Sequence, residues 1–175
     1  MENIETPRLI LRPLTCGDRD VIVRLLNDID VSRWLTVVPY PYTADDFDAF
    51  LEYLQAGSVF EGLAIQTEEG VIGVIGIGDT LGYWLGKPFH GKGYMTEAAE
   101  ALTDWYFETS GARVLSSGYF EGNSGSCAVL KKLGFQPTGR VISEHSQAQG
   151  RAVPLIKVSL NRADWLNRAD WDQSK

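Results

Sequence analysis

Hydrophobic and polar positions along the first third of the chain follow two different periods, which divide it into strand and helix. Residues 8–14 (RLILRPL) alternate between apolar and polar side chains, as a half-buried strand does. Thr15 and Asp18 follow with the spacing of a capping box, in which Asp takes the place of the usual Glu or Gln. Four apolar residues then recur at helical spacing and predict one buried stripe: Val21, Ile22, Leu25 and Leu26.

Two further helical pieces are expected before residue 57, separated by a loop. The first is short and carries Val31, Trp34 and Leu35. Residues 36–42 (TVVPYPY) contain two prolines and are predicted to be loop. Thr43 is expected to cap the next helix, whose apolar stripe consists of Phe47, Phe50, Leu51 and Leu54.

The middle of the chain changes to β character and then alternates between strands and helices. Residues 59–67 and 71–78 predict a hairpin that turns at 68–70, and residues 81–85 predict a further strand. The remaining predicted elements are a helix over 94–109, a strand over 113–119, a helix over 124–133 ended by Gly134, and strands over 135–146 and 151–160.

This order of elements predicts a single α/β (α+β) domain over residues 1–175, with a core over about 6–165. We expect one mixed central sheet of about seven strands flanked by about four helices. Asn-Arg-Ala-Asp-Trp occurs at 161–165 and again at 167–171, which is too short a repeat to indicate a solenoid. We interpret the repeat segment as a short C-terminal helix or tail, with residues 166–175 as the tail.

Composition and charge exclude several functional classes. Hydrophobic residues make up 44% and charged residues 22%, which is typical of a globular protein. The net charge of −7 argues against nucleic-acid binding. No disulfide framework is expected from the two cysteines, Cys16 and Cys127. The two histidines, His90 and His145, are too few for an ordinary zinc ligand set, so no metal is expected. The chain shows neither a signal peptide nor an apolar run that could span a membrane, which predicts a cytoplasmic protein without a membrane partner.

The chemical signal lies at the start of the helix predicted over 94–109. Residues 86–92 match the first seven positions of a phosphate-binding P-loop, but Gly93 stands where that loop needs Ser or Thr. Gly73, Gly76, Gly78 and Gly82 do not form a dinucleotide fingerprint, because the segment continues as strand, and we interpret them as sites where another backbone or a ligand approaches closely. What remains is a strand, a Gly-Lys-Gly turn and a helix N-terminus, whose unpaired N–H groups favour an anion.

Extended in both directions, this segment resembles a known loop. Residues 82–98 (GYWLGKPFHGKGYMTEA) are similar to the acetyl-CoA pyrophosphate loop of the GNAT acetyltransferase superfamily, and more narrowly to its RimJ and RimL branch of ribosomal-protein N-terminal acetyltransferases. Residues 123–135 match a second motif of that family, Asn-x-x-Ser-x-x-Val-Leu-x-x-Leu-Gly-Phe. The opening 6–14 and the closing Asp164-Trp165 also resemble this branch.

The resemblance implies a splayed sheet that holds acetyl-CoA as co-substrate, with no metal. It implies pairing of the pantetheine arm with the strand ending Tyr83-Trp84-Leu85, and contacts of Asn123 and Ser126 with the arm and the thioester sulfur. Lys132, and with it Lys131, is a candidate for the outer phosphate, although a solvated helix face explains the pair equally well. The residues implied around the pyrophosphate are His90, Gly91, Lys92, Gly93, Tyr94, Met95 and Thr96.

Two positions depart from the superfamily pattern. Pro88 replaces an Arg or Gln at the start of the loop, which matters little where backbone donors dominate. Leu130 occupies the position of a tyrosine general acid, so Ser126 becomes the candidate proton donor to the thiolate, whose pKa near ~8.5 demands little help. An ordinary polar role for Ser126 at a helix start is the alternative.

The general base and the acceptor are less well marked. Glu144 is the base we favour over His145, which alternation sends to the opposite face of the strand, and over Glu61. Four aromatic residues are candidates to line the acceptor site, although such residues are commonly core: Trp34, Tyr40, Tyr42 and Phe60.

The predicted function is acetyl transfer from acetyl-CoA to a primary amine, either a protein N-terminus or a small molecule, by direct attack in a ternary complex. The protein is expected to act as a monomer or a homodimer. One alternative is an acetyl-CoA-sensing module without strong catalysis, and a less favoured one is a phosphate-loop nucleotide-binding protein.

Overall fold

The computed structural model describes residues 3–57 and 59–168. Within them one sheet of eight strands runs in the order β1-β2-β3-β4-β5-β6-β8-β7. Its strands are Ile4–Glu5, Ile10–Pro13, Leu63–Thr67, Gly70–Ile77, Leu81–Leu85, Val114–Phe120, Gln136–Ser146 and Arg151–Asn161 for β1 to β8. The helices are Arg19–Leu26, Ile29–Ser32, Ala44–Ala56, Tyr94–Thr109, Ser124–Lys132 and Arg162–Asn167 for α1 to α6. The predicted α/β class is therefore confirmed.

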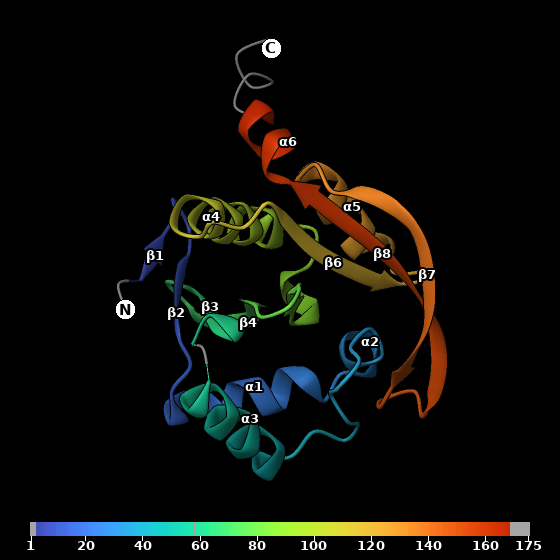
Figure 1. Cartoon of the computed structure of the whole chain (residues 1–175). Helices are drawn as coiled ribbons and strands as arrows, with labels where there is room; N and C mark the ends of the chain where they lie inside the picture. The colour runs from blue at the N-terminus through green and yellow to red at the C-terminus, as the bar shows by residue number, and fades with distance from the viewer. Residues whose placement is uncertain (1–2, 58, 169–175) are drawn as a thin grey trace.

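Helices cover both faces of the sheet (Figure 1). α1 and α3 lie on one face and α4 and α5 on the other, while β7 and β8 curve away from the central strands. Two buried clusters correspond to these two layers, one around Leu102 of α4 and one around Phe47 of α3. β4 is buried on both faces, which explains why its sequence (GVIGVIGI) is a continuous apolar run and does not alternate.

The N-terminal capping predictions are confirmed. Thr15 and Asp18 form the capping box, here at a 3-10 turn over Cys16–Asp18 that leads into α1. Thr43 caps α3 through Asp46 in the same way. One short strand, β1, and its pairing with β2 were not predicted, because two residues carry no period.

The predicted strand over 59–67 is wrong in its first part. Val59–Glu61 forms a 3-10 turn, and the strand begins at Leu63. This segment passes directly over β4, where a Cβ on Gly76 would lie 2.1 Å from the carbonyl oxygen of Glu61. A Cβ on Gly73 would likewise lie 2.2 Å from the carbonyl oxygen of Trp84. Gly73 and Gly76 therefore permit close backbone approach.

The second half of the chain matches the predicted elements to within one or two residues. α4 and β5 have the predicted bounds, and Gly134, with φ of 89°, ends the region of α5. β5 and β6 run parallel and share one registered pair, Leu81 with Ser117. Beyond that pair the two strands separate. The second copy of the Asn-Arg-Ala-Asp-Trp repeat falls mostly on residues 169–175, outside the described residues.

Asp18 provides a test of the N-terminal layer. Its carboxylate accepts hydrogen bonds from both Nη atoms of Arg12 and from the amide and hydroxyl of Thr15. Burial alone would raise the pKa of Asp18, but the bonds from Arg12 and Thr15 outweigh it and lower that pKa. We expect Asp18→Asn to lower the free energy of unfolding by about 2 kcal/mol near pH 7.

The pH dependence of this loss has a defined sign. A carboxylate whose pKa is lowered by folding contributes stability above its unfolded pKa, and that contribution is lost as the pH falls from about 4 through the folded pKa. Urea unfolding at pH 7 and pH 3 should therefore show a smaller difference between wild type and Asp18→Asn at the lower pH. An equal difference at both pH values would contradict the assignment.

Candidate active site

A cavity of about 690 Å³ opens where β5 and β6 separate. Its walls come from β5, the turn into α4, the end of β6, the start of α5, β8 and the segment after α2. Most of the residues predicted for cofactor binding lie in these walls: Tyr83, Trp84, Leu85, His90, Gly91, Gly93, Tyr94, Met95, Thr96, Asn123, Ser126 and Lys132. The fold thus brings together two motifs that lie about thirty residues apart in the sequence.

The edge of β5 presents unpaired backbone groups to the cavity. Ser117 Oγ donates to the carbonyl oxygen of Leu81 across the gap (2.8 Å), so the backbone groups of Leu81 point towards β6. Because backbone groups alternate along a strand, those of Tyr83 and Leu85 point the same way, past the last registered pair. The Leu85 carbonyl accepts a bond from His90 Nε2 (2.8 Å), which leaves the remaining groups for an extended ligand.

The turn between β5 and α4 has the form of an anion site. Gly91 and Gly93 have φ of 73° and 80°, which is the left-handed region that favours glycine. The first backbone bond of the helix runs from the amide of Glu97 to the carbonyl of Gly93. No amide of residues 91–96 donates to an acceptor within the described chain, so these N–H groups remain available to a ligand.

Asn123, Ser126 and Tyr83 form one polar group on the opposite wall. Asn123 caps α5, because its Oδ1 accepts a bond from the Ser126 amide (3.1 Å), and its amide nitrogen remains a donor. The Ser126 hydroxyl lies 3.0 Å from the hydroxyl of Tyr83. Burial raises the pKa of Tyr83 well above its usual value, so the phenol stays protonated and can donate.

Four lysines lie in or near the two motifs and the neighbouring strand β8. Lys132 lines the cavity, as the motif implies, whereas Lys131 is not among the lining residues that the structure describes. Lys92 is exposed, with its ammonium 5.7 Å from the centre of the Phe89 ring, and its side chain does not line the cavity. Lys157 of β8 does line it, opposite Gly118 of β6.

The segment that follows α2 forms a further wall of the cavity. Trp34 lines it and lies against Gly122, where an added Cβ would be 3.6 Å from the indole ring. The carbonyl of Arg33 accepts bonds from Ser146 (3.3 Å) and Gln149 (2.7 Å) of the β7–β8 hairpin. This segment therefore connects the N-terminal helices to the β7–β8 hairpin beside the cavity.

The other aromatic candidates for the acceptor site lie elsewhere. Tyr40 is 47% exposed on the loop. Tyr42 is buried in the cluster with α1 and α3, where burial and the charge of Asp46 raise its pKa to about 12. Phe60 stacks on Trp105 of α4, with ring centroids 3.9 Å apart. Their spacing in the sequence could not separate these packing roles from a binding role.

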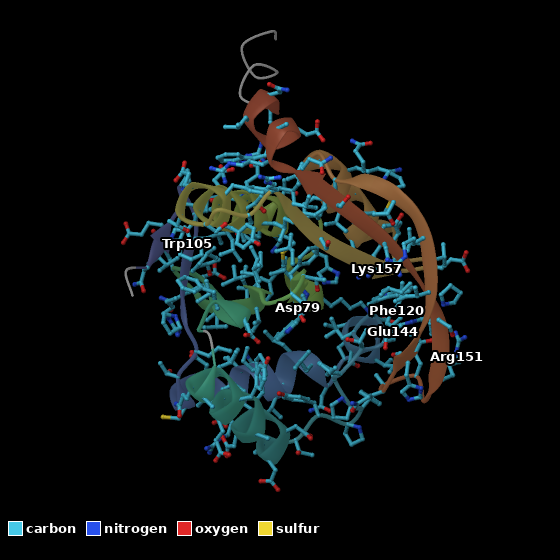
Figure 2. The ribbon with its side chains drawn as sticks, viewed as in Figure 1. Asp79, Trp105, Phe120, Glu144, Arg151 and Lys157 are labelled. Atoms are coloured by element: carbon cyan, nitrogen blue, oxygen red, sulfur yellow. The ribbon has the colours of Figure 1, made fainter. Side chains whose placement is uncertain are left out.

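Glu144 and His145 point to opposite faces of β7, as alternation requires. Ile142 is paired with Leu155, which lines the cavity, and Glu144 lies two residues further along the same face. Figure 2 places Glu144 with Phe120 on this side of the hairpin. His145 is exposed on the other face. Glu144 is not one of the described residues that line the cavity, although it shares a face of the hairpin with Leu155, which does.

Glu61, the third candidate base, is engaged elsewhere. Its carboxylate accepts a hydrogen bond from the hydroxyl of Tyr53 in α3.

Among the described residues, no three His, Cys, Asp or Glu side chains are grouped so that they could hold a metal ion. Across residues 3–57 and 59–168, no helix has both the length and the apolar character needed to cross a membrane.

Sequence reasoning missed the side-chain role of Tyr83 and the presence of Leu155 and Lys157. The motif around Tyr83 concerns the edge of the strand, so it predicts a role for the Tyr83 backbone and none for its side chain. Leu155 and Lys157 lie on β8, about twenty residues beyond the end of the second motif, and only the pairing of β8 with β6 brings them to the cavity. Their alternation on the strand was the one available signal.

A family model for the acetyltransferase (GNAT) domain matches residues 8–136. A curated N-acetyltransferase of uncharacterized role from Bacillus licheniformis, p20, is 26% identical, and the alignment covers 94% of this chain and 99% of that protein.

Solved structures share the fold over nearly their whole length. The ribosomal-protein-S5-alanine acetyltransferase from Vibrio fischeri aligns with a TM-score of 0.77 and 19% identity, over 94% of this chain and 99% of that chain. RimL, a ribosomal L7/L12 alpha-N-protein acetyltransferase in complex with coenzyme A, aligns with a TM-score of 0.73 and 18% identity, over 91% and 98%. At these identities the neighbours show that the chain has the fold of these acetyltransferases.

Proposed function

Because the chain belongs to the GNAT family of acetyltransferases, it is an N-acetyltransferase, and we propose that it moves the acetyl group of acetyl-CoA directly to a primary amine. The acceptor that we favour is the amino group at a protein N-terminus. The observation that carries the proposal is the turn over 91–93, whose unpaired amides lie in the same cavity as the unpaired edge of β5. Family membership also argues against the phosphate-loop NTPase that the first seven positions of the turn suggested.

We assign the cofactor to the walls of this cavity by charge and shape. The pyrophosphate would lie on the amides of residues 91–96, where the helix dipole of α4 favours an anion. The pantetheine arm would extend along Tyr83 and Leu85 and accept or donate bonds as a further strand does, with Asn123 donating from its amide nitrogen. Lys132 would meet an outer phosphate.

The proposed reaction begins with attack of a neutral amine nitrogen on the thioester carbonyl carbon. Backbone donors of the separated strand would stabilise the oxyanion, and its collapse breaks the carbon–sulfur bond. The thiolate of coenzyme A leaves and takes a proton from Ser126, whose oxygen would then accept a hydrogen bond from the Tyr83 hydroxyl 3.0 Å away. The amine would lose its proton to Glu144 through water, because Glu144 does not line the cavity.

The choice of acceptor rests on two kinds of support. The solved structures with this fold include enzymes that are named for acetylating ribosomal proteins, one of them at an α-amino group. The segment containing Trp34 lines the cavity and is joined to the β7–β8 hairpin through the Arg33 carbonyl. We take a wall built from this segment and the edge of a hairpin to suit the free end of an extended chain better than a bulky ring system.

A panel of amines with detection of the released thiol tests the proposal. It should contain short peptides with free N-termini, the same peptides acetylated in advance, a polyamine and an aminoglycoside. We expect acetyl-CoA-dependent thiol release with the free peptides and none with the blocked ones. Thiol release with the small amines alone would replace the peptide acceptor, and calorimetric binding of acetyl-CoA without any thiol release would indicate a sensing module.

Glu144 can be tested against its neighbour. We expect Glu144→Gln to lower kcat by about tenfold, because a proton that passes through water is only partly dependent on one carboxylate. His145→Gln is the matched control, since His145 is exposed on the opposite face of the same strand, and it should leave kcat unchanged. A loss in the His145 variant with full activity in the Glu144 variant would reverse the assignment.

A further inference from the structure

The start of α4 is tied to the N-terminal segment by one carboxylate. Glu97 Oε1 accepts bonds from the Thr6 hydroxyl (2.7 Å) and the Arg8 amide (2.9 Å). Glu97 Oε2 lies 2.6 Å from both Nε and Nη2 of Arg8. Burial would raise the pKa of Glu97, but the bonds from Thr6 and Arg8 outweigh it and lower that pKa, so the group is ionised near pH 7. A carboxylate at a helix N-terminus usually serves only to complement the helix dipole, whereas Glu97 also joins α4 to the N-terminal segment.

Arg8 uses its remaining nitrogen on the glycine turn. Nη1 donates to the carbonyl oxygen of Lys92 (3.0 Å), between the two glycines that have positive φ. The guanidinium also lies over the ring of Tyr94, 4.7 Å from its centre. The carbonyl of a trans peptide and the following N–H point in opposite directions. When Arg8 holds the Lys92 carbonyl, the amide of Gly93 is consequently directed away from Arg8.

We propose that Arg8 is a positioning residue for an anionic ligand of this turn, and that it acts in two ways. It prevents the peptide between Lys92 and Gly93 from turning its carbonyl into the anion site, which the conformational freedom of Gly93 would otherwise permit. It also neutralises Glu97, whose charge would repel a pyrophosphate at the same helix end. The inference rests on the proposed function, since it takes that anion to be the pyrophosphate of acetyl-CoA.

Calorimetry with coenzyme A on Arg8→Gln, Glu97→Gln and the double variant separates the two effects. We expect Arg8→Gln to weaken binding about tenfold, the factor that corresponds to one charge-assisted hydrogen bond. Glu97→Gln should weaken it less, because the loss of support for Arg8 is offset by the loss of a negative charge. The double variant should bind more tightly than Arg8→Gln, since no uncompensated carboxylate remains.

Kinetics with two donors distinguish positioning from general damage to the fold. Arg8→Gln should raise KM for acetyl-CoA with little change in kcat, and should leave kcat/KM for S-acetylpantetheine, which lacks the pyrophosphate, unchanged. Arg8→Lys should restore part of the affinity for coenzyme A. The control is the exposed ion pair of Arg19 and Asp48 (2.8 Å), and the corresponding variant Arg19→Gln should affect neither donor.

Each remaining outcome has a separate meaning. If wild-type protein does not bind coenzyme A, the proposed function fails and the inference fails with it. If wild type binds but Arg8→Gln binds equally well, or if the double variant binds more weakly than Arg8→Gln, the positioning role of Arg8 is wrong while the proposed function stands. Equal losses with acetyl-CoA and S-acetylpantetheine would likewise overturn it in favour of a purely structural role.

Discussion

Replacing Gly91 by Asp is expected to weaken the binding of coenzyme A by about a hundredfold or more, the largest effect on affinity that this site offers. Gly91 has φ of 73°, and no heavy atom lies within 4 Å of the position that a Cβ would take. Asp is one of the few residues that tolerate this backbone region, so the fold should survive. Its carboxylate, however, would stand beside the proposed pyrophosphate in a turn that otherwise presents only N–H donors.

Gly139 provides a matched control for backbone strain. It has φ of 75°, it also has no heavy atom within 4 Å of a built Cβ, and it lies in β7 away from the cavity. Gly139→Asp should lower the melting temperature about as much as Gly91→Asp and leave the affinity for coenzyme A intact. Equal affinities of the two variants, measured by calorimetry, would mean that the turn does not hold the anion.

The cofactor side of the site was largely predictable from the sequence, for a physical reason. A turn that presents its backbone amides to an anion uses glycine where φ is positive, so the requirement is visible within a short stretch of sequence, here at Gly91 and Gly93. The same holds for Asn123 and Ser126, which are joined by a capping bond within a single helical turn. Local chemistry of this kind leaves a local pattern.

The cavity walls outside the two motifs were not predictable in the same way, because distant strands and packing build them. Lys157 reaches the cavity only through the pairing of β8 with β6. Tyr42 and Phe60 have the composition of a binding wall, yet one packs under α3 and the other stacks on Trp105. The predicted strand over Val59–Glu61 failed for a related reason, since its crossing over Gly76 is a tertiary contact that no period records.

The strand register shows which of Glu144 and His145 shares a face with the cavity-lining Leu155, a question that the sequence left open. Alternation showed that Glu144 and His145 could not both face inward, but it did not say which one would. Ser146, two residues from Glu144 on the same face, is fully buried and donates to the segment after α2, and this contact orients β7. Such a contact between residues 113 positions apart is visible only in the folded chain.

Ser126→Ala is expected to lower kcat by about a hundredfold and to leave the affinity for coenzyme A within about threefold of wild type. The reason is that the hydroxyl is proposed to protonate the leaving thiolate, which exists as such only after the carbon–sulfur bond has begun to break. Tyr83→Phe should lower kcat by about tenfold, because it removes the donor to the Ser126 oxygen but keeps the β5 backbone edge.

Tyr119→Phe is the matched control for Tyr83. Tyr119 also lines the cavity with a phenol, but its hydrogen bond to Cys127, which raises the pKa of Tyr119, involves neither Ser126 nor the proposed path of the proton. It should therefore retain wild-type kcat. Steady-state kinetics with acetyl-CoA and an accepted amine decide the matter: a Ser126→Ala variant with unaltered kcat would remove Ser126 from the reaction. Equal losses in Tyr83→Phe and Tyr119→Phe would reduce the role of Tyr83 to packing.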